Sequence, residues 1–182
     1  MEHIVDIKTS EQMEKQLMEM LKWFQTNSLG NPFNYNRAFE WLQSRLLGFE
    51  LTKVGGGSDG INETGVTAEF KAAAWKGFCK NGQEKTHSFT YNGTSRYPTW
   101  KEQKEYAKKK IMRDPYHYWS IIDYDNGCFV RTYKVPSETV WKLIKPKWYN
   151  SWKDSVNRKD PRVGGAISTN GLNGKEFEII VH

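Results

Sequence analysis

One strand-like segment, residues 66–75, limits what this chain can fold into more than any other feature. With the two-residue period of a β-strand, one face carries only apolar side chains, which are Val66, Ala68, Phe70, Ala72 and Ala74. The opposite face carries Glu69 and Lys71 next to each other. A strand of this kind buries its apolar face, so the segment predicts a sheet with a core on one side and an acid and an amine held together on the other.

A glycine-rich turn before this strand adds a second carboxylate. Residues 55–58 are Gly-Gly-Gly-Ser, Asp59 follows them, and residues 49–54 have the composition of a short strand. Glycines permit a tight turn, so a hairpin of the two strands would bring Asp59 close to Glu69 and Lys71. Two carboxylates suit Mg²⁺, and a neighbouring lysine can hold water and a phosphate oxygen. The alternative is a solvated strand face with a weak ion pair, because short motifs of this kind also arise by chance.

Hydrophobic spacing and capping residues predict the other elements. Helices are expected at 10–27, 36–47 and 99–113, with a short one from Ser137. Strands are expected at 116–124, 128–135 and 177–181, the first two joined by a turn at 125–127. Residues 145–160 are expected to form a basic, Trp-containing tail after the last helix. A length of 182 residues predicts a single domain, and the mixture of elements predicts an α/β protein of the α+β kind.

The composition favours a polyanionic partner. The formal net charge is +6, and the eight Trp residues are interleaved with Lys, as at Trp100-Lys101 and Trp152-Lys153. Amines neutralise phosphates and aromatic rings pack against bases or sugars, although large aromatic residues more often belong to the core. The sequence has no apolar run that could cross a bilayer and no apparent leader, so no membrane partner and a cytoplasmic location are expected. Two cysteines are too few for a structural zinc site.

These residues resemble a known family, the PD-(D/E)xK nucleases, and within it the PvuII-like type II restriction endonucleases. The resemblance rests on the interval from Gly48 to Asp59, on the spacing of Asp59, Glu69 and Lys71, and on the segment 76–78. A weaker likeness continues in the same order through Trp119, Ile121, Tyr124, Gly127, Tyr133, Pro136 and residues 147–152. It spans roughly residues 34–161.

The resemblance implies a restriction-endonuclease-like fold, a central mixed β-sheet flanked by helices. It divides the domain into a helical dimerisation region at 1–48, a catalytic core at 49–135 and a DNA-recognition region at 136–182. Asp59, Glu69 and Lys71 would be catalytic, and Mg²⁺ would be held by Asp59, Glu69 and the backbone carbonyl of Phe70. The expected activity is cleavage of double-stranded DNA at a short palindromic site by a homodimer. A DNA methyltransferase acting on the same site would be its partner.

The expected DNA contacts come from two regions. They are Lys76, His87, Ser88, Lys153, Asn157, Arg158, Lys159 and Arg162. His87 could instead be a surface loop residue, residues 157–159 could contact phosphates rather than bases, and His117 is expected to be structural. The chain departs from the family in having Ser58 before the first Asp, glycine in place of an acid in the turn, and Thr86-His87-Ser88 where the family has consecutive histidines. A different target sequence is therefore implied.

Other functions remain open on the sequence. A junction-resolving or nicking nuclease would use the same metal-binding residues. A non-catalytic DNA- or RNA-binding module would share the basic, aromatic surface but would not need Asp59. A Trp-rich carbohydrate-binding domain fits the basic charge less well.

Overall fold

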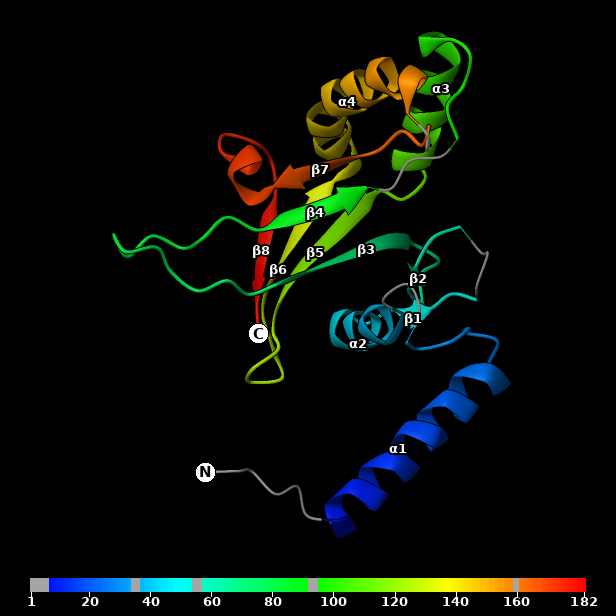
Figure 1. The fold of residues 1–182 in the computed structure, drawn as a ribbon, viewed down its shortest axis with the longest axis vertical. Coiled ribbons are helices and arrows are strands. Elements are labelled where there is room, and N and C mark those ends of the chain that lie inside the picture. The colour runs from blue at the N-terminus through cyan, green and yellow to red at the C-terminus, as the bar shows by residue number, and fades with distance from the viewer. Residues whose placement is uncertain (1–6, 34–36, 54–56, 92–94, 159–160) are drawn as a thin grey trace.

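A computed structural model defines the fold over residues 7–33, 37–53, 57–91, 95–158 and 161–182 (Figure 1). The helices of this part are α1 (Ile7–Thr26), α2 (Arg37–Leu47), α3 (Trp100–Ile111) and α4 (Ser137–Asp154), with short 3-10 turns η1 (Ser155–Asn157) and η2 (Thr169–Leu172). The strands are β1 (Glu50–Leu51), β2 (Gly60–Ile61), β3 (Thr67–Ala74), β4 (Ser88–Tyr91), β5 (Tyr116–Asp123), β6 (Cys128–Pro136), β7 (Gly165–Ser168) and β8 (Glu178–Val181).

Six of these strands form one mixed sheet in the order β1-β2-β3-β5-β6-β8. Strands β3 and β5 are parallel, and the other neighbours are antiparallel. The crossover from β3 to β5 passes through β4 and α3, and β4 pairs with β7 in a separate two-stranded sheet. The expected mixed sheet flanked by helices is therefore confirmed. In this register Glu69 lies opposite His117, and Lys71 lies opposite Trp119.

The sheet has a core on each face. The larger core packs α3, α4 and the β4-β7 ribbon against one face and contains Phe89, Trp119, Ile144 and Trp148, all fully buried. The smaller core, on the opposite face, contains Phe49, Ala68, Phe70 and Tyr118. Ala68 and Phe70 are buried on one face while Glu69 and Lys71 lie on the other, so the two-residue period expected for β3 is confirmed in this part of the strand. Val66 and Ala74, which were expected on the buried face, are exposed. The acid and the amine face the side of α3.

Two helix boundaries follow directly from local sequence chemistry. Thr99 and Glu102 form the expected capping box at the start of α3, each side chain accepting a hydrogen bond from the other residue's backbone N–H. Helix α2 ends before Gly48, whose φ of +74° is the left-handed conformation that favours glycine after a helix. The second boundary places β1, which begins two residues after Gly48, at the entry to the sheet.

Helix α4 is longer than the sequence predicted: residues 145–154, which were expected to belong to a basic tail after the last helix, continue it. Its buried residues Val140, Trp141, Ile144 and Trp148 recur at helical spacing. The burial of these large side chains stabilises the helix on both sides of Pro146, so the helix continues past this residue. The Lys residues between them project outward on an ordered helix. The short strands β2, β4 and β7, of two to four residues, were also missed.

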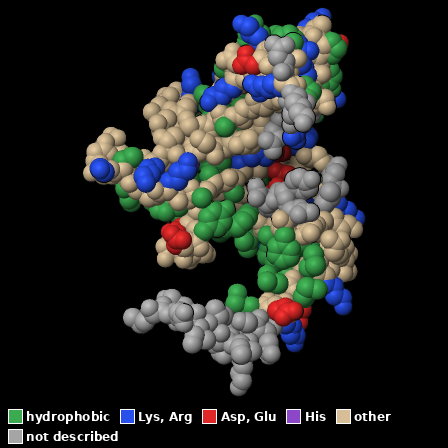
Figure 2. Space-filling view, in the orientation of Figure 1, with side chains coloured by type: hydrophobic (Ala, Val, Ile, Leu, Met, Phe, Trp, Pro, Cys, Tyr) green, Lys and Arg blue, Asp and Glu red, His purple; other side chains and the backbone are tan. Residues whose placement is uncertain are grey.

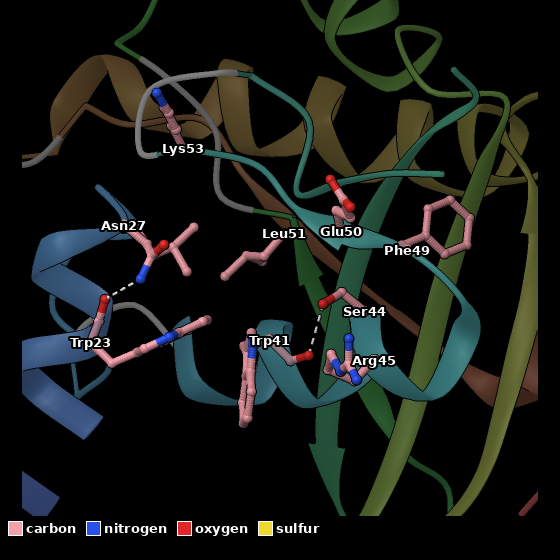
Figure 3. Close-up of a pocket in the computed structure, with 10 residues that line it drawn as sticks. Trp23, Asn27, Trp41, Ser44, Arg45, Phe49, Glu50, Leu51 and Lys53 are labelled. Atoms are coloured by element: carbon pink, nitrogen blue, oxygen red, sulfur yellow. Dashed lines mark hydrogen bonds between the residues drawn. The ribbon is translucent and has the colours of Figure 1, made fainter. Parts of the chain in front are cut away.

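Helix α1 projects away from the sheet, as Figure 1 shows. Its carboxyl end packs on α2 through the rings of Trp23 and Phe24 against Trp41, with centroids 5.6 and 6.0 Å apart. A cavity of about 370 Å³ lies at this junction, and Figure 3 shows Trp23 and Trp41 on its wall with β1 on the far side. Neither Glu69 nor Lys71 lines this cavity. It therefore belongs to the contact between α1 and the rest of the domain and not to the predicted site.

Substituting Gly60 with Ala tests how tightly β2 sits on β3. A Cβ at residue 60 would lie 2.7 Å from Cζ of Phe70, which is fully buried, so the ring or the strand must shift. We expect Gly60→Ala to lower the free energy of unfolding by about 1–3 kcal/mol. Gly171→Ala is the matched control, because its Cβ would meet its nearest neighbour at an ordinary 3.6 Å. Thermal unfolding of both variants measures the difference, and equal stabilities would show that the β2-β3 packing is loose.

Among the helices of the described residues, none combines the length and the apolar character needed to cross a membrane.

Candidate functional site

Asp59 is fixed between two strands by four hydrogen bonds, one of which the Thr52 hydroxyl donates to the Asp59 carbonyl at 3.2 Å. Its N–H donates to the carbonyl of Ala68 at 2.9 Å, and its carbonyl accepts from the N–H of Thr52 at 2.9 Å. Its side-chain Oδ2 accepts from the N–H of Phe70 at 2.8 Å. The carboxylate therefore lies against the backbone of β3 beside Glu69 and Lys71. The expected hairpin is corrected in one respect: β3 pairs with β2, which begins after Asp59, while the strand expected at 49–54 shrinks to β1.

Glu69 is contacted by two cations, one on each carboxylate oxygen. Lys71 Nζ lies 2.5 Å from Oε1, and Nη2 of Arg113 donates to Oε2 at 2.9 Å. Lys71 Nζ also donates to the carbonyl of Phe70 at 3.0 Å. Asp59, Glu69, Phe70 and Lys71, predicted together from the sequence, are thus brought together in space. Arg113, at the end of α3, was not predicted.

The charges in this cluster are strongly interdependent. Burial and the neighbouring Glu69 carboxylate raise the pKa of Asp59 to about 7. Burial alone would raise the pKa of Glu69, but Lys71 and Arg113 together lower it. Burial likewise opposes the charge of Lys71, yet Glu69 and Asp59 raise its pKa. In the protein without a cation, the carboxylates therefore hold the Lys71 ammonium charged.

The donor set suits a hard cation. Two carboxylates and the Phe70 carbonyl are oxygen ligands, and Mg²⁺ typically binds one or two carboxylates while keeping several waters. Across the part of the chain that the structure describes, no group of three or more His, Cys, Asp and Glu side chains has metal-site geometry. A cation here would therefore be held by Asp59, Glu69 and the carbonyl, completed by water. It would supply charge neutralisation for a bound phosphate.

Two further residues near the carboxylates have no signal in the sequence. Glu40, in α2, is close enough to interact electrostatically with Asp59, Glu69 and Lys71, and burial raises its pKa although Arg37 pairs with it at 2.7 Å. Lys110, in the last turn of α3, has its pKa lowered by burial. An Arg-Glu pair at helical spacing is common on any surface helix, so nothing in the sequence distinguished Glu40.

A buried hydrogen-bond network of Tyr91, Trp119 and His117 lies next to Lys71. The Tyr91 ring lies 5.6 Å from Lys71 Nζ, and the Tyr91 hydroxyl accepts from Nε1 of Trp119 at 2.7 Å. His117 contacts the Tyr91 hydroxyl through Nδ1 at 3.0 Å and the Ile111 carbonyl through Nε2 at 2.9 Å. Because only an N–H can satisfy the carbonyl, Nε2 carries the proton and Tyr91 donates to Nδ1. The buried His117 is bonded on both sides, in agreement with its expected structural role.

The first group of predicted DNA contacts lies on a projecting arm, residues 75–87, between β3 and β4 (Figure 1). Lys76 is exposed on the arm, and Ser88 is exposed at the start of β4. His87 differs from both expectations for it, because its side chain is fully buried. Its ring stacks on Trp75 at 5.5 Å, and Nε2 accepts from the Lys76 N–H at 3.3 Å. His87 therefore shapes the arm and presents no edge to a base in this conformation.

The second group lies at the carboxyl end of α4, near the top of Figure 1, whereas the arm tip projects to the left, well away from it. Lys153, Arg158 and Arg162 are exposed there, and Arg158 lies 3.9 Å from the Asp154 carboxylate. Asn157 belongs to η1, while Lys159 and the side chain of Asn157 lie outside the described residues. One protomer thus does not bring the two groups together. Figure 2 shows Lys and Arg side chains gathered both over the α3-α4 end and along the arm.

The chain fits no protein-family model, and no curated protein matches its sequence.

Proposed function

We propose that this protein is a Mg²⁺-dependent endonuclease that hydrolyses phosphodiester bonds of double-stranded DNA at a short, palindromic site, as a type II restriction endonuclease does. The observation that carries the proposal is the convergence of Asp59, Glu69 and Lys71 on one end of β3. Phosphodiester hydrolysis requires neutralisation of the phosphate charge, an aligned water and stabilisation of the leaving oxygen. Asp59 and Glu69 would hold the cation, and Lys71 would hold the water and a phosphate oxygen.

Basic surfaces over the α3-α4 end and along the arm support a DNA substrate (Figure 2). Exposed Lys residues lie along α3 and α4, and the arm carries Lys76, Lys80 and Lys85. Positive side chains neutralise backbone phosphates and release counterions, so they position a duplex without reading its sequence. A DNA methyltransferase protecting the same site would accompany such an enzyme in the cytoplasm.

Cleavage of plasmid DNA tests the proposal. Purified protein is incubated with supercoiled plasmid with and without Mg²⁺, and the ends of any fragments are sequenced. Discrete fragments that require Mg²⁺ are expected. Asp125→Asn is the matched control for Asp59→Asn, because Asp125 is exposed in the distant β5-β6 turn. DNA binding that is unaffected by Asp59→Asn, with no cleavage in any metal, would favour the non-catalytic binding module. Cleavage confined to branched DNA would favour a junction resolvase.

A dimer through α1 would supply the second active site for the opposite strand. Met13, Leu17 and Met18 of α1, together with Phe33 from the segment after it, line an apolar surface and are each between 47 and 59% exposed. A helix with this much exposed apolar area favours association with a second copy.

Leu17→Glu is therefore expected to convert the protein from a dimer to a monomer, because a carboxylate would be buried without a partner in the interface. Light scattering should give about twice the 21.3 kDa chain mass for the wild type and a single chain mass for the variant. Lys15→Gln makes the same change of charge on the same helix and should remain dimeric. A wild-type protein that is monomeric at micromolar concentration would contradict the assignment of α1.

A further inference from the structure

The end of α3 carries an arginine whose contacts exceed those of a simple surface ion pair. Nη2 of Arg113 donates to Glu69 Oε2 at 2.9 Å, and Nε donates to Asp114 Oδ2 at 3.0 Å. The remaining guanidinium nitrogen, Nη1, lies beside Gly57 in the turn before Asp59. It would be 3.3 Å from a Cβ atom added to Gly57. The guanidinium therefore joins Glu69 to Asp114, an acid outside the site, and lies beside the turn that precedes Asp59.

The two acids that contact Arg113, Asp114 and Glu69, differ in how firmly they are fixed. Asp114 is fully buried, and the chain around it is fixed by Ser137, whose hydroxyl donates to the Asp114 carbonyl and whose N–H donates to the Pro115 carbonyl at 3.1 Å. Glu69 is the shared partner, since Lys71 already neutralises its other oxygen. The Arg113 side chain is 34% exposed, against 21% for Lys71. Arg113 is thus the cation that can leave Glu69 while keeping its position through Asp114.

We propose that Arg113 binds a DNA phosphate only after a divalent cation has bound. In the metal-free protein its guanidinium is hydrogen-bonded to Glu69 Oε2, and it turns to a DNA phosphate when the cation takes that oxygen. The inference rests on the proposed nuclease function. A divalent cation beside Asp59 and Glu69 repels the guanidinium, and a phosphate restores its charge balance. A planar guanidinium suits this exchange because it can keep Nε on Asp114 while its outer N–H groups bind phosphate oxygens.

Metal binding without DNA gives the first test. Mn²⁺ is titrated calorimetrically into wild type, Arg113→Gln and Lys109→Gln, the last removing one charge from an exposed position in the last turn of α3, shortly before Arg113. Removal of a direct competitor should make Arg113→Gln bind Mn²⁺ about three- to ten-fold more tightly than wild type. Lys109→Gln should stay within about two-fold, because a distant exposed charge is screened. Equal affinities for the two variants would overturn the inference.

DNA binding gives the second test, by fluorescence anisotropy of a labelled duplex with and without Ca²⁺. Arg113→Gln should lose about ten-fold in affinity with Ca²⁺ and less than about two-fold without it, because the wild-type guanidinium reaches the phosphate only when Glu69 is occupied. Arg113→Lys keeps the charge but cannot bridge Asp114 and a phosphate, so it should show the same Ca²⁺-dependent loss and serves if Arg113→Gln is unstable. Equal losses in both conditions would overturn the inference alone. A wild-type protein that binds no Mn²⁺ would overturn the proposed function as well.

Discussion

Asp59→Asn is expected to abolish Mg²⁺-dependent cleavage and, at the same time, to stabilise the metal-free protein above neutral pH. The loss of cleavage, by at least about 100-fold, follows from the removal of a charged oxygen ligand beside Glu69. The gain in stability follows from electrostatics. Asp59 is partly buried next to two other acids, and an amide can still accept the hydrogen bond from the Phe70 N–H. Activity and stability should therefore change in opposite directions.

The pH dependence of this stability has a definite sign. The pKa of Asp59 is raised from 3.8 to about 7, so between these values the folded protein holds a proton that the unfolded chain has lost. The wild-type free energy of unfolding should therefore fall as pH rises through this window, with Asp59 contributing on the order of 2–4 kcal/mol. Asp59→Asn removes this part of the dependence.

Chemical denaturation of both proteins from about pH 5 to pH 8 in a chelator measures the effect. The difference in the free energy of unfolding between the two proteins should already be present at pH 5, grow as pH rises to about 7 and level off above it. A variant that is less stable than wild type at every pH would show that Asp59 is not held in a crowded acidic site. Asp125→Asn, in the exposed turn, should follow the wild type throughout.

Lys71→Met is expected to have the opposite effect on stability and the same effect on cleavage. Lys71 neutralises Glu69 directly and interacts with Asp59 and Glu40, so its loss leaves buried carboxylates with too little positive charge. Removing one partner of such a cluster costs about 3–5 kcal/mol. Cleavage should fall by about 10²–10⁴-fold, because water and phosphate lose their positioned cation. Thermal unfolding in a chelator and plasmid cleavage in Mg²⁺ measure the two effects.

A double-mutant cycle makes this prediction sharper. With Asp59 also changed to Asn, fewer acids remain for Lys71 to neutralise, so the double variant should be destabilised by less than the sum of the two single effects. The coupling should shrink near pH 5, where Asp59 is protonated. Additive effects at about pH 8 would contradict the close acid-amine geometry at β3.

The parts of the fold and site that follow from local patterns were predictable. The alternation along β3, the capping box of Thr99 and the stop at Gly48 each depend on neighbouring residues alone. Asp59 and Glu69 could be paired because only ten residues separate them. The length of α4 was underestimated because Pro146 and many lysines obscure the apolar face of the helix in the sequence, and that face is recognised only from its tertiary packing.

The remaining site residues come from distant segments. Arg113 reaches Glu69 only because the β3-α3-β5 crossover returns the chain alongside β3, and Glu40 reaches the same place from α2. No spacing in the sequence encodes such a contact. The burial of His87 likewise depends on its stacking against Trp75 across the arm.

Direct location of a bound cation tests the shared site most plainly. Crystals of the protein soaked in Mn²⁺ are measured at a wavelength where Mn²⁺ scatters anomalously. We expect an anomalous peak in contact with the carboxylates of Asp59 and Glu69 and the carbonyl of Phe70, absent in Asp59→Asn. A fully soaked crystal with no peak there, or with Mn²⁺ bound only elsewhere, would contradict the assignment of these residues as a metal-dependent nuclease site.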